Sequence, residues 1–280
     1  MVLRLRFLAL LAFLSFTLTL ALPLPAQQAR WEALNAQVTE LYQRGRYAEA
    51  VPVAQEALRV AEGTFGPEHP FVATALNNLA LLYHEQGQYE AEPLYQRSLA
   101  IREKALGPDH PDVAQSLNNL AELYRDQGKY AQAEPLYQRS LAIVEKALGP
   151  EHPYVATSLN NLAELYHDQG QYAQAEPLYQ RSLAILEKAL GPEHPDVAQS
   201  LNNLAELYRD QGKYAQAEPL YHRALSIQEK ALGPEHPDVA TTLENYAALL
   251  RKINREAEAE KLEGRAQAIR AKHTSKNPPN

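Results

Sequence analysis

The side chains with the clearest binding chemistry are adjacent pairs of asparagines that recur about 42 residues apart. An amide both donates and accepts hydrogen bonds, so a row of amides could hold the backbone of an extended polypeptide whatever its sequence. The same row could instead bond neighbouring helices to each other, and one residue could serve both purposes. The asparagines of this row are Asn77, Asn78, Asn118, Asn119, Asn160, Asn161, Asn202, Asn203 and Asn245.

A glutamate, a basic residue and an aspartate follow three of the asparagine pairs, as in Glu122, Arg125 and Asp126. The glutamate and the basic residue are three positions apart, which places them on one face of a helix, where such a pair contributes roughly 0.2–0.5 kcal/mol. We therefore expect local pairing on a solvated face, with no dominant basic surface. The basic residues that we regard as candidates for binding are Arg125, His167 and Arg209.

One histidine per repeat precedes a proline, and such a series raises the question of metal binding. Equivalent histidines should lie about 10 Å or more apart, because packed helices are about 8–10 Å apart. Zinc needs ligand nitrogens at about 2.0–2.1 Å. We therefore expect a turn or helix-capping role, with no metal and no other cofactor. These histidines are His69, His110, His152, His194 and His236.

Composition argues against several other functions. The chain has no cysteine, which excludes disulfides, thiolate metal sites and cysteine nucleophiles. Its net charge of −7, without a cluster of lysine and arginine, makes it a poor candidate for nucleic acid. Ser116, Ser158 and Ser200 lie beside an apolar stripe, and no glycine elbow or acid–base constellation accompanies them. We expect no enzymatic activity; a site assembled across distant repeats is the weakest alternative.

All of these residues belong to one repeating unit of about 42 residues. Residues 107–148 and 191–232 are identical at 37 of 42 positions. Self-similarity at this period predicts stacked units that cover one another's apolar faces.

Each unit reads as two helices. The apolar residues of 111–127 are spaced as on one face of a helix. Pro111 suits its first turn and Gly128 its left-handed end. A second helix is expected from about Ala131, with its start limited by Pro135, because only the first four amides of a helix lack partners.

The pattern of small and apolar residues resembles the tetratricopeptide repeat. The residues that carry this resemblance are Leu117, Leu120, Ala121, Tyr124, Gly128, Ala133 and Tyr137. The longer period and the strings LNNLAELY, AEPLYQRSL and GPEHPDVA resemble the kinesin light chain type of that repeat. The resemblance covers roughly residues 31–270.

The resemblance implies an all-α fold, a right-handed superhelix of antiparallel helix hairpins. It also implies that the first helices line a concave groove for a protein or peptide partner. The second asparagine of each pair would bond the partner's backbone there. These are Asn78, Asn119, Asn161, Asn203 and Asn245. The alternative is a carrier or chaperone for extended envelope polymers, which tyrosines facing the groove would favour; the spacing of Tyr83, Tyr124 and Tyr166 places them in the core instead.

The N-terminus predicts a targeting segment. Arg4 and Arg6 precede an apolar stretch that ends near Pro23 and Ala26, a pattern typical of a secretory signal. The alternative is an uncleaved membrane anchor that faces the extracytoplasmic side, since about 20 apolar residues span a bilayer. We expect a periplasmic or secreted protein.

The expected organisation divides the chain at its Gly-Pro breaks. It comprises a signal segment at 1–26, a solenoid at 27–270 and a disordered tail at 271–280. Within the solenoid we expect hairpins at about 31–65, 66–106, 107–148, 149–190 and 191–232, with a degenerate cap at 233–270. In that cap Asn254 stands where the other units have a turn glycine.

A longer period of two units overlies the short one. The basic position near the end of the first helix reads His84, Arg125, His167 and Arg209 in successive units. An aromatic residue follows the His-Pro pair in alternate units. This alternation has two possible explanations. It is inherited from duplication of a pair of units, or it matches a partner that is itself extended or repetitive.

Overall fold

The computed structural model describes residues 24–276, which form twelve helices paired as six successive hairpins. The first three hairpins are α1 (Leu24–Gln43) with α2 (Tyr47–Phe65), α3 (Pro70–Glu85) with α4 (Ala91–Leu106), and α5 (Pro111–Asp126) with α6 (Tyr130–Leu148). The last three are α7 (Pro153–Asp168) with α8 (Tyr172–Leu190), α9 (Pro195–Asp210) with α10 (Tyr214–Leu232), and α11 (Pro237–Lys252) with α12 (Glu256–Lys276). The predicted all-α solenoid is confirmed.

The repeated histidines start the first helices. In α5, Nδ1 of His110 accepts a hydrogen bond from the backbone N–H of Asp112 at 3.1 Å, and Pro111 occupies the first helical position. The bond satisfies one of the amides that the helix itself leaves free. The same cap occurs at His69, His152, His194 and His236. The predicted capping role is confirmed.

Turn residues end the first helices as predicted. Gly128 has φ 69°, and the N–H of Lys129 returns to the carbonyl of Tyr124 at 2.8 Å. Asn254 has φ 61° at the equivalent place in the last hairpin. A side-chain amide tolerates this left-handed conformation better than most side chains do.

The second helix begins slightly earlier than predicted. It starts at Tyr130, so Pro135 lies inside α6 instead of within the four free amides of its first turn. The proline therefore removes one helical hydrogen-bond donor. The lost bond is tolerated because the rest of α6 packs against the core through Ala133 and Tyr137.

The second hairpin absorbs its missing residue at the turn, as the sequence predicts. Helix α4 begins only at Ala91, which leaves Tyr89 outside the helix and 88 % exposed. The remainder of α4 keeps its register, since the hydroxyl of Ser98 donates to the carbonyl of Ala73 at 2.8 Å. Equivalent serines in α6 and α8 make the same bond at the same distance.

A continuous core runs through the stack instead of a single centre. Its largest fully buried side chains include one tyrosine from each of four second helices, Tyr95, Tyr137, Tyr179 and Tyr221. Buried alanines on both helices, such as Ala121 and Ala133, let the helices of a hairpin approach closely. Each hairpin buries its apolar face against the next one, which is why no single unit would be stable alone.

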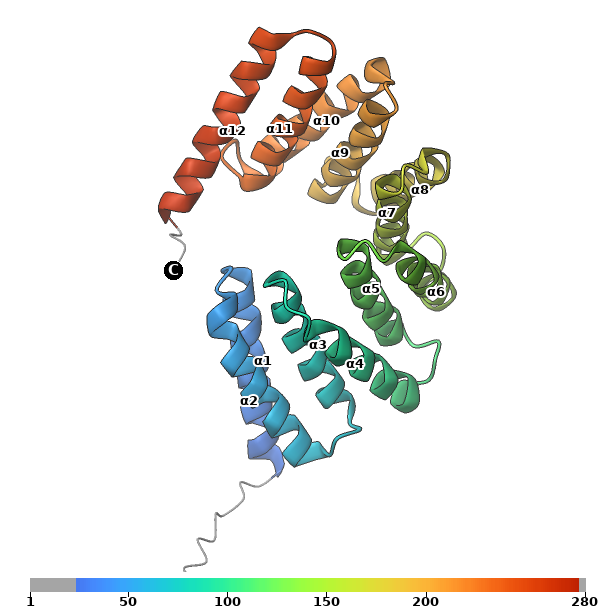
Figure 1. Cartoon of the computed structure of the whole chain (residues 1–280), viewed down its shortest axis with the longest axis vertical. Helices are drawn as coiled ribbons and strands as arrows, with labels where there is room; N and C mark the ends of the chain where they lie inside the picture. The colour runs from blue at the N-terminus through green and yellow to red at the C-terminus, as the bar shows by residue number, and fades with distance from the viewer. Residues whose placement is uncertain (1–23, 277–280) are drawn as a thin grey trace, which may run out of the picture.

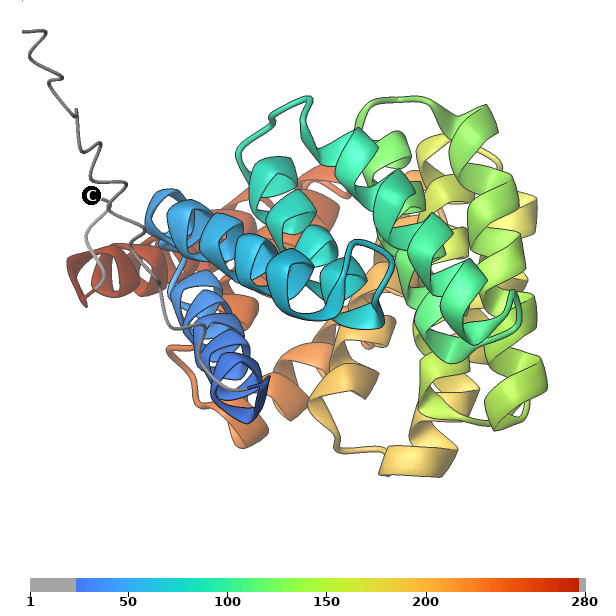
Figure 2. The same ribbon diagram turned by 90° about the horizontal axis from the view of Figure 1, so that it is seen from below.

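The hairpins curve into an open ring, with α5, α7 and α9 toward its inside and α6 and α8 outside (Figure 1). Turned by 90°, they follow one another around the curve from α1 and α2 to α12 (Figure 2). Consecutive first helices contact each other, as α3 does with α5 and α5 with α7. We call the surface formed by the first helices the concave face.

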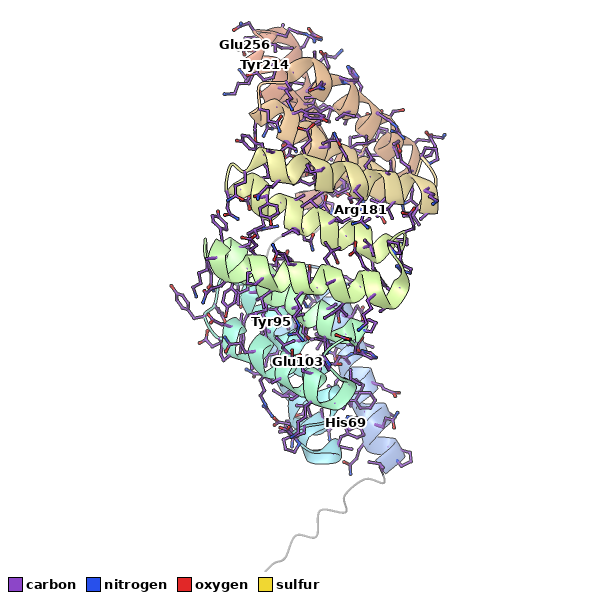
Figure 3. The ribbon with its side chains drawn as sticks, turned by 90° about the vertical axis from the view of Figure 1, so that its right-hand side faces the viewer. His69, Tyr95, Glu103, Arg181, Tyr214 and Glu256 are labelled. Atoms are coloured by element: carbon purple, nitrogen blue, oxygen red, sulfur yellow. The ribbon has the colours of Figure 1, made fainter. Side chains whose placement is uncertain are left out.

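The outer face is joined by exposed ion pairs between consecutive second helices. Arg181 of α8 lies 2.7 Å from Glu145 of α6, and Arg139 of α6 lies 2.5 Å from Glu103 of α4. Figure 3 views the molecule from its outer side and labels Arg181 and Glu103. These pairs are solvated, so each contributes about 0–1 kcal/mol to stability.

Both ends of the array differ from the predicted boundaries. Helix α12 continues to Lys276, so the predicted disordered tail at 271–280 begins too early: residues 271–276 are helical. The described part of the array starts at Leu24, inside the predicted signal segment, and the rest of that segment lies outside the described residues. Within residues 24–276, no helix is both long enough and apolar enough to cross a bilayer.

Candidate functional site on the concave face

The asparagines form a ladder that links consecutive first helices. The second asparagine of each pair donates its amide to the first asparagine of the preceding hairpin, as Asn119 does to Asn77 at 2.9 Å. The other rungs are Asn161 to Asn118 at 2.8 Å, Asn203 to Asn160 at 3.1 Å and Asn245 to Asn202 at 3.3 Å. A role in bonding neighbouring helices is therefore present throughout the array.

The ladder also includes a residue that sequence reasoning missed. Asn78 donates to Asn35 of α1 at 2.7 Å, although the first hairpin has no asparagine pair. The signal that could have revealed Asn35 is its separation of 43 residues from Asn78, the same as between Asn161 and Asn118.

Five asparagines keep hydrogen-bonding groups that the ladder does not use. Within the described chain, the carbonyl oxygens of Asn78, Asn119, Asn161 and Asn245 and the amide N–H groups of Asn118 make no hydrogen bond, and all five side chains are partly exposed. By contrast, Asn202 and Asn203 are buried and satisfied within the protein. Asn118, Asn119 and Asn161 thus offer, in the middle of the array, amide groups that a partner could reach.

The predicted local pairing of charges is wrong, because the contacts run between hairpins. Nη1 of Arg125 lies 2.5 Å from a carboxylate oxygen of Glu164, in the next first helix. His84 and His167 likewise pair with the next hairpin, at 2.9 Å from Asp126 and Asp210 respectively. First helices pack side by side in parallel, so residues about 40 apart in sequence approach more closely than residues three apart on one helix. Arg209 differs and pairs with the adjacent Asp210 at 2.9 Å.

Two of the glutamates on this face are largely shielded from water. Burial raises the pKa of Glu122 and that of Glu206 above their ordinary value. Desolvation disfavours the charged form of a carboxyl group. Glu206 accepts hydrogen bonds from Asn202 and Asn245, whereas Glu122 accepts none among the described residues.

Tyr124 and Tyr166 lie in the core, as predicted, whereas Tyr83, for which the same was predicted, is only partly buried. The hydroxyl of Tyr124 donates to Glu92 at 3.0 Å, and Gln96 donates to that hydroxyl at 3.1 Å, both from the second helix of the preceding hairpin. Tyr166 is held equivalently. These rings tie one hairpin to the next and offer no aromatic groove surface.

Three cavities open on this side of the molecule. The first, about 570 Å³, lies between the ends of α1, α3 and α5 and includes His84 and Glu122. The second, about 400 Å³, lies between the ends of α5, α7 and α9 and includes His167. The third, about 370 Å³, lies between α5, α6 and α7, where it is lined by Asn118 and Asn119.

The predicted alternation of aromatic residues is only partly available to a partner. Tyr154 is 65 % exposed at the edge of the third cavity. Phe71, its counterpart two units earlier, stacks on Trp31 with ring centroids 4.2 Å apart. Nowhere in residues 24–276 do three histidine, aspartate or glutamate side chains gather as they would around a metal ion.

Comparison with known proteins identifies the repeat. The profile of the tetratricopeptide repeat matches five overlapping segments, at residues 39–91, 89–146, 112–188, 154–221 and 196–272. The chain belongs to the tetratricopeptide repeat family. No curated protein matches it.

Solved structures place this tetratricopeptide repeat protein near kinesin light chain-like arrays. It is 33 % identical to a Podosopora anserina putative kinesin light chain with nearly identical repeats, at a TM-score of 0.61 over 74 % of this chain and 98 % of that one. It is 26 % identical to BtubC (BKLC) from P. vanneervenii, at a TM-score of 0.64 over 85 % and 92 %. A Rap protein complexed with competence and sporulation factor shares the fold at 17 % identity and a TM-score of 0.62, over 87 % and 75 %.

Proposed function

We propose that this tetratricopeptide repeat protein is a non-catalytic scaffold that holds an extended segment of a partner protein against its concave face. The observation that carries the proposal is the set of unused amide groups on Asn118, Asn119 and Asn161. Amides that are partly exposed and have a free hydrogen-bonding group can bond the backbone of a partner, whatever its sequence. The third cavity, which Asn118 and Asn119 line, has room for a side chain of that segment.

The comparisons support this kind of function in general terms. Tetratricopeptide repeat proteins are generally protein-interaction scaffolds, and the Rap protein structure holds competence and sporulation factor. A carrier of envelope polymers is less well supported, because Tyr124 and Tyr166 are buried in the core instead of facing the groove.

We place this scaffold outside the cytoplasm, as a periplasmic or secreted protein. The support is the sequence pattern alone, with Arg4 and Arg6 before an apolar stretch and Ala26 after it. Cell fractionation with N-terminal sequencing tests the proposal. A mature chain that begins near residue 27 supports secretion. An intact N-terminus in the membrane fraction supports the anchor.

Binding is tested with peptides selected from a displayed library by the purified chain. Replacing Asn119 and Asn161 with alanine should weaken binding of the selected peptides about tenfold, because two backbone bonds of about 0.5–1.5 kcal/mol each are lost. The matched control replaces Asn202 and Asn203, which carry equivalent ladder bonds but are already satisfied. Both double variants should lose thermal stability. If both also bind peptide like the parent, the asparagines serve only the array.

A further inference from the structure

The first and second cavities are two copies of one arrangement, two hairpins apart. In the first, His84 pairs with Asp126 of the next hairpin at 2.9 Å, beside Glu122. In the second, His167 pairs with Asp210 at the same distance, beside Glu206. We call them the histidine cavities. Each histidine of the alternating series therefore lines a cavity, and the second cavity is also lined by Arg125, Glu164 and Asp168 of the intervening pair.

Arg125 shows how a cation is held at the equivalent position of the intervening hairpin, and it also lines the second cavity. Its guanidinium reaches across to the next first helix, 2.5 Å from Glu164 and 3.6 Å from Asp168. Glu122 of α5 is the counterpart of Glu164 one hairpin earlier. The basic residue at the equivalent position of α3, the preceding first helix, is His84. The side chain of histidine is shorter than that of arginine, so His84 reaches only Asp126. Glu122 is left without a hydrogen-bond donor at the wall of the first cavity.

A tyrosine of the second helix lies behind each cavity. The hydroxyl of Tyr95 is fully buried and makes no hydrogen bond, and the charged or polar groups that act on it, Glu122, Tyr42 and Glu85, all line the first cavity. In the second cavity the equivalent tyrosine, Tyr179, is itself part of the lining. Tyr137 and Tyr221, behind the arginine hairpins, also have a buried hydroxyl without a partner, whereas Tyr179 is not among these residues, so the hydroxyl of Tyr95 supports a ligand or water only together with the open first cavity.

The two tyrosines are placed identically. The ring centroids of Tyr95 and His84 lie 6.5 Å apart at an interplanar angle of 84°, and those of Tyr179 and His167 have the same values. Figure 3 labels Tyr95, which belongs to α4 behind the concave face. The geometry is therefore a repeated feature of the array and not an accident of one hairpin.

We propose that the two histidine cavities each take one cationic side chain, a lysine or an arginine, of a single extended and basic partner segment. The proposal rests on the proposed function of the concave face. The segment would supply at Glu122 the cation that Arg125 supplies at Glu164. The cavities also lie at the carboxyl-terminal ends of the first helices, where the helix dipole favours positive charge.

The spacing of the cavities sets the spacing of the two cations. First helices of neighbouring hairpins pack about 10 Å apart, so two units separate the cavities by about 20 Å. An extended chain covers about 3.3–3.6 Å per residue, which corresponds to about six residues. The first cavity should contribute more affinity than the second, because Glu206 is already bonded by Asn202 and Asn245.

The first test measures binding of synthetic peptides to the purified full chain by calorimetry. The probe is a twelve-residue peptide of serine and alanine that carries two lysines six positions apart. Matched peptides carry norleucine at both positions or bring the lysines two positions apart. The peptide with lysines six positions apart should bind at least about tenfold more tightly than the norleucine peptide or the peptide with closely spaced lysines. Its affinity should fall as the salt concentration rises.

The second test fills the cavities with a side chain that the array already accommodates. His84→Arg and His167→Arg place a guanidinium where Arg125 has one, so the fold should be preserved or stabilised. His84→Arg, in the first cavity, should weaken binding of the lysine peptide about tenfold. His167→Arg, in the second cavity, should weaken it less. Glu122→Gln should also weaken it. The control Glu260→Gln removes an equal charge from the exposed surface of α12 and should leave affinity unchanged.

The outcomes separate this inference from the proposed function. If the norleucine peptide binds as tightly as the lysine peptide, or His84→Arg has no effect, the inference is wrong, while a groove that still depends on Asn119 and Asn161 stands. A crystal structure with the peptide bound and only water in both cavities also overturns the inference. If no peptide binds but butylammonium shifts the NMR signals of His84, the cavities bind cations and the groove proposal fails.

Discussion

Some side chains on the concave face bond neighbouring hairpins to each other, whereas others remain available to a partner. Arg125 and Glu164 pair across two hairpins, and the ladder asparagines bond across hairpins in the same way, although several keep an unused group. Glu122 is the exception, since its carboxylate is mostly removed from water without gaining a hydrogen-bond donor. A protein commonly keeps such a group only where it serves function, because burying a charge without a partner costs stability.

Glu122→Gln should therefore stabilise the unliganded chain at neutral pH, by on the order of 1 kcal/mol. Burial raises the pKa of Glu122, so the folded state is penalised while the carboxyl is ionised, and the penalty is relieved as pH falls through the raised pKa. The stability difference between the variant and the parent should shrink on acidification. Denaturant unfolding at several pH values checks this.

The control for that experiment is Glu164→Gln, because Glu164 is the same residue one unit later but is paired with Arg125. This change should destabilise the chain at neutral pH. A Glu122→Gln variant that is less stable than the parent at neutral pH would contradict the account of Glu122 as an unpaired carboxylate.

The elements themselves follow closely from local sequence signals. The histidine caps, the left-handed turn at Gly128 and the compensated deletion in the second hairpin were all predictable, because each depends on neighbours within a few residues. The exposure of Tyr89 was not predictable. It depends on how the shortened turn meets α1 and α5, which no local pattern encodes.

Inserting an alanine between Tyr89 and Glu90 restores the turn that the later hairpins have. We expect α4 to gain a first turn that starts near Tyr89, as α6 starts at Tyr130, and the first cavity to become smaller. Amide hydrogen exchange at residues 89–91 should slow, and the thermal midpoint should rise. An alanine inserted after Glu151, in a loop between hairpins, is the control and should produce neither change. Unchanged exchange at the restored turn would show that another constraint holds Tyr89 out of the helix.

The fold of the whole array was predictable from the sequence, but the contacts between side chains on its surface were not. A 42-residue period determines stacked hairpins, and the family match and solved relatives confirm them. Contacts such as Arg125 with Glu164 and His84 with Asp126 escaped prediction, because they depend on the lateral approach of parallel helices. Asn35 joined the ladder for the same reason. Sequence periodicity identifies which residues share a face, whereas curvature decides which of them meet.

Deleting residues 107–190 removes one pair of hairpins and tests the two-unit period in the complete array. The deletion brings His84 next to Glu206 and Asp210, which preserves the order of histidine and arginine hairpins. We expect a folded chain with a lower thermal midpoint, because stability in a stacked array is roughly a sum over neighbouring units. It should keep one histidine cavity and bind the two-lysine peptide only as tightly as a one-lysine peptide. Deleting residues 107–148 alone is the control, since it retains both His84 and His167. Undiminished affinity after the pair deletion would mean that the alternation is inherited duplication, without a repetitive partner to match it.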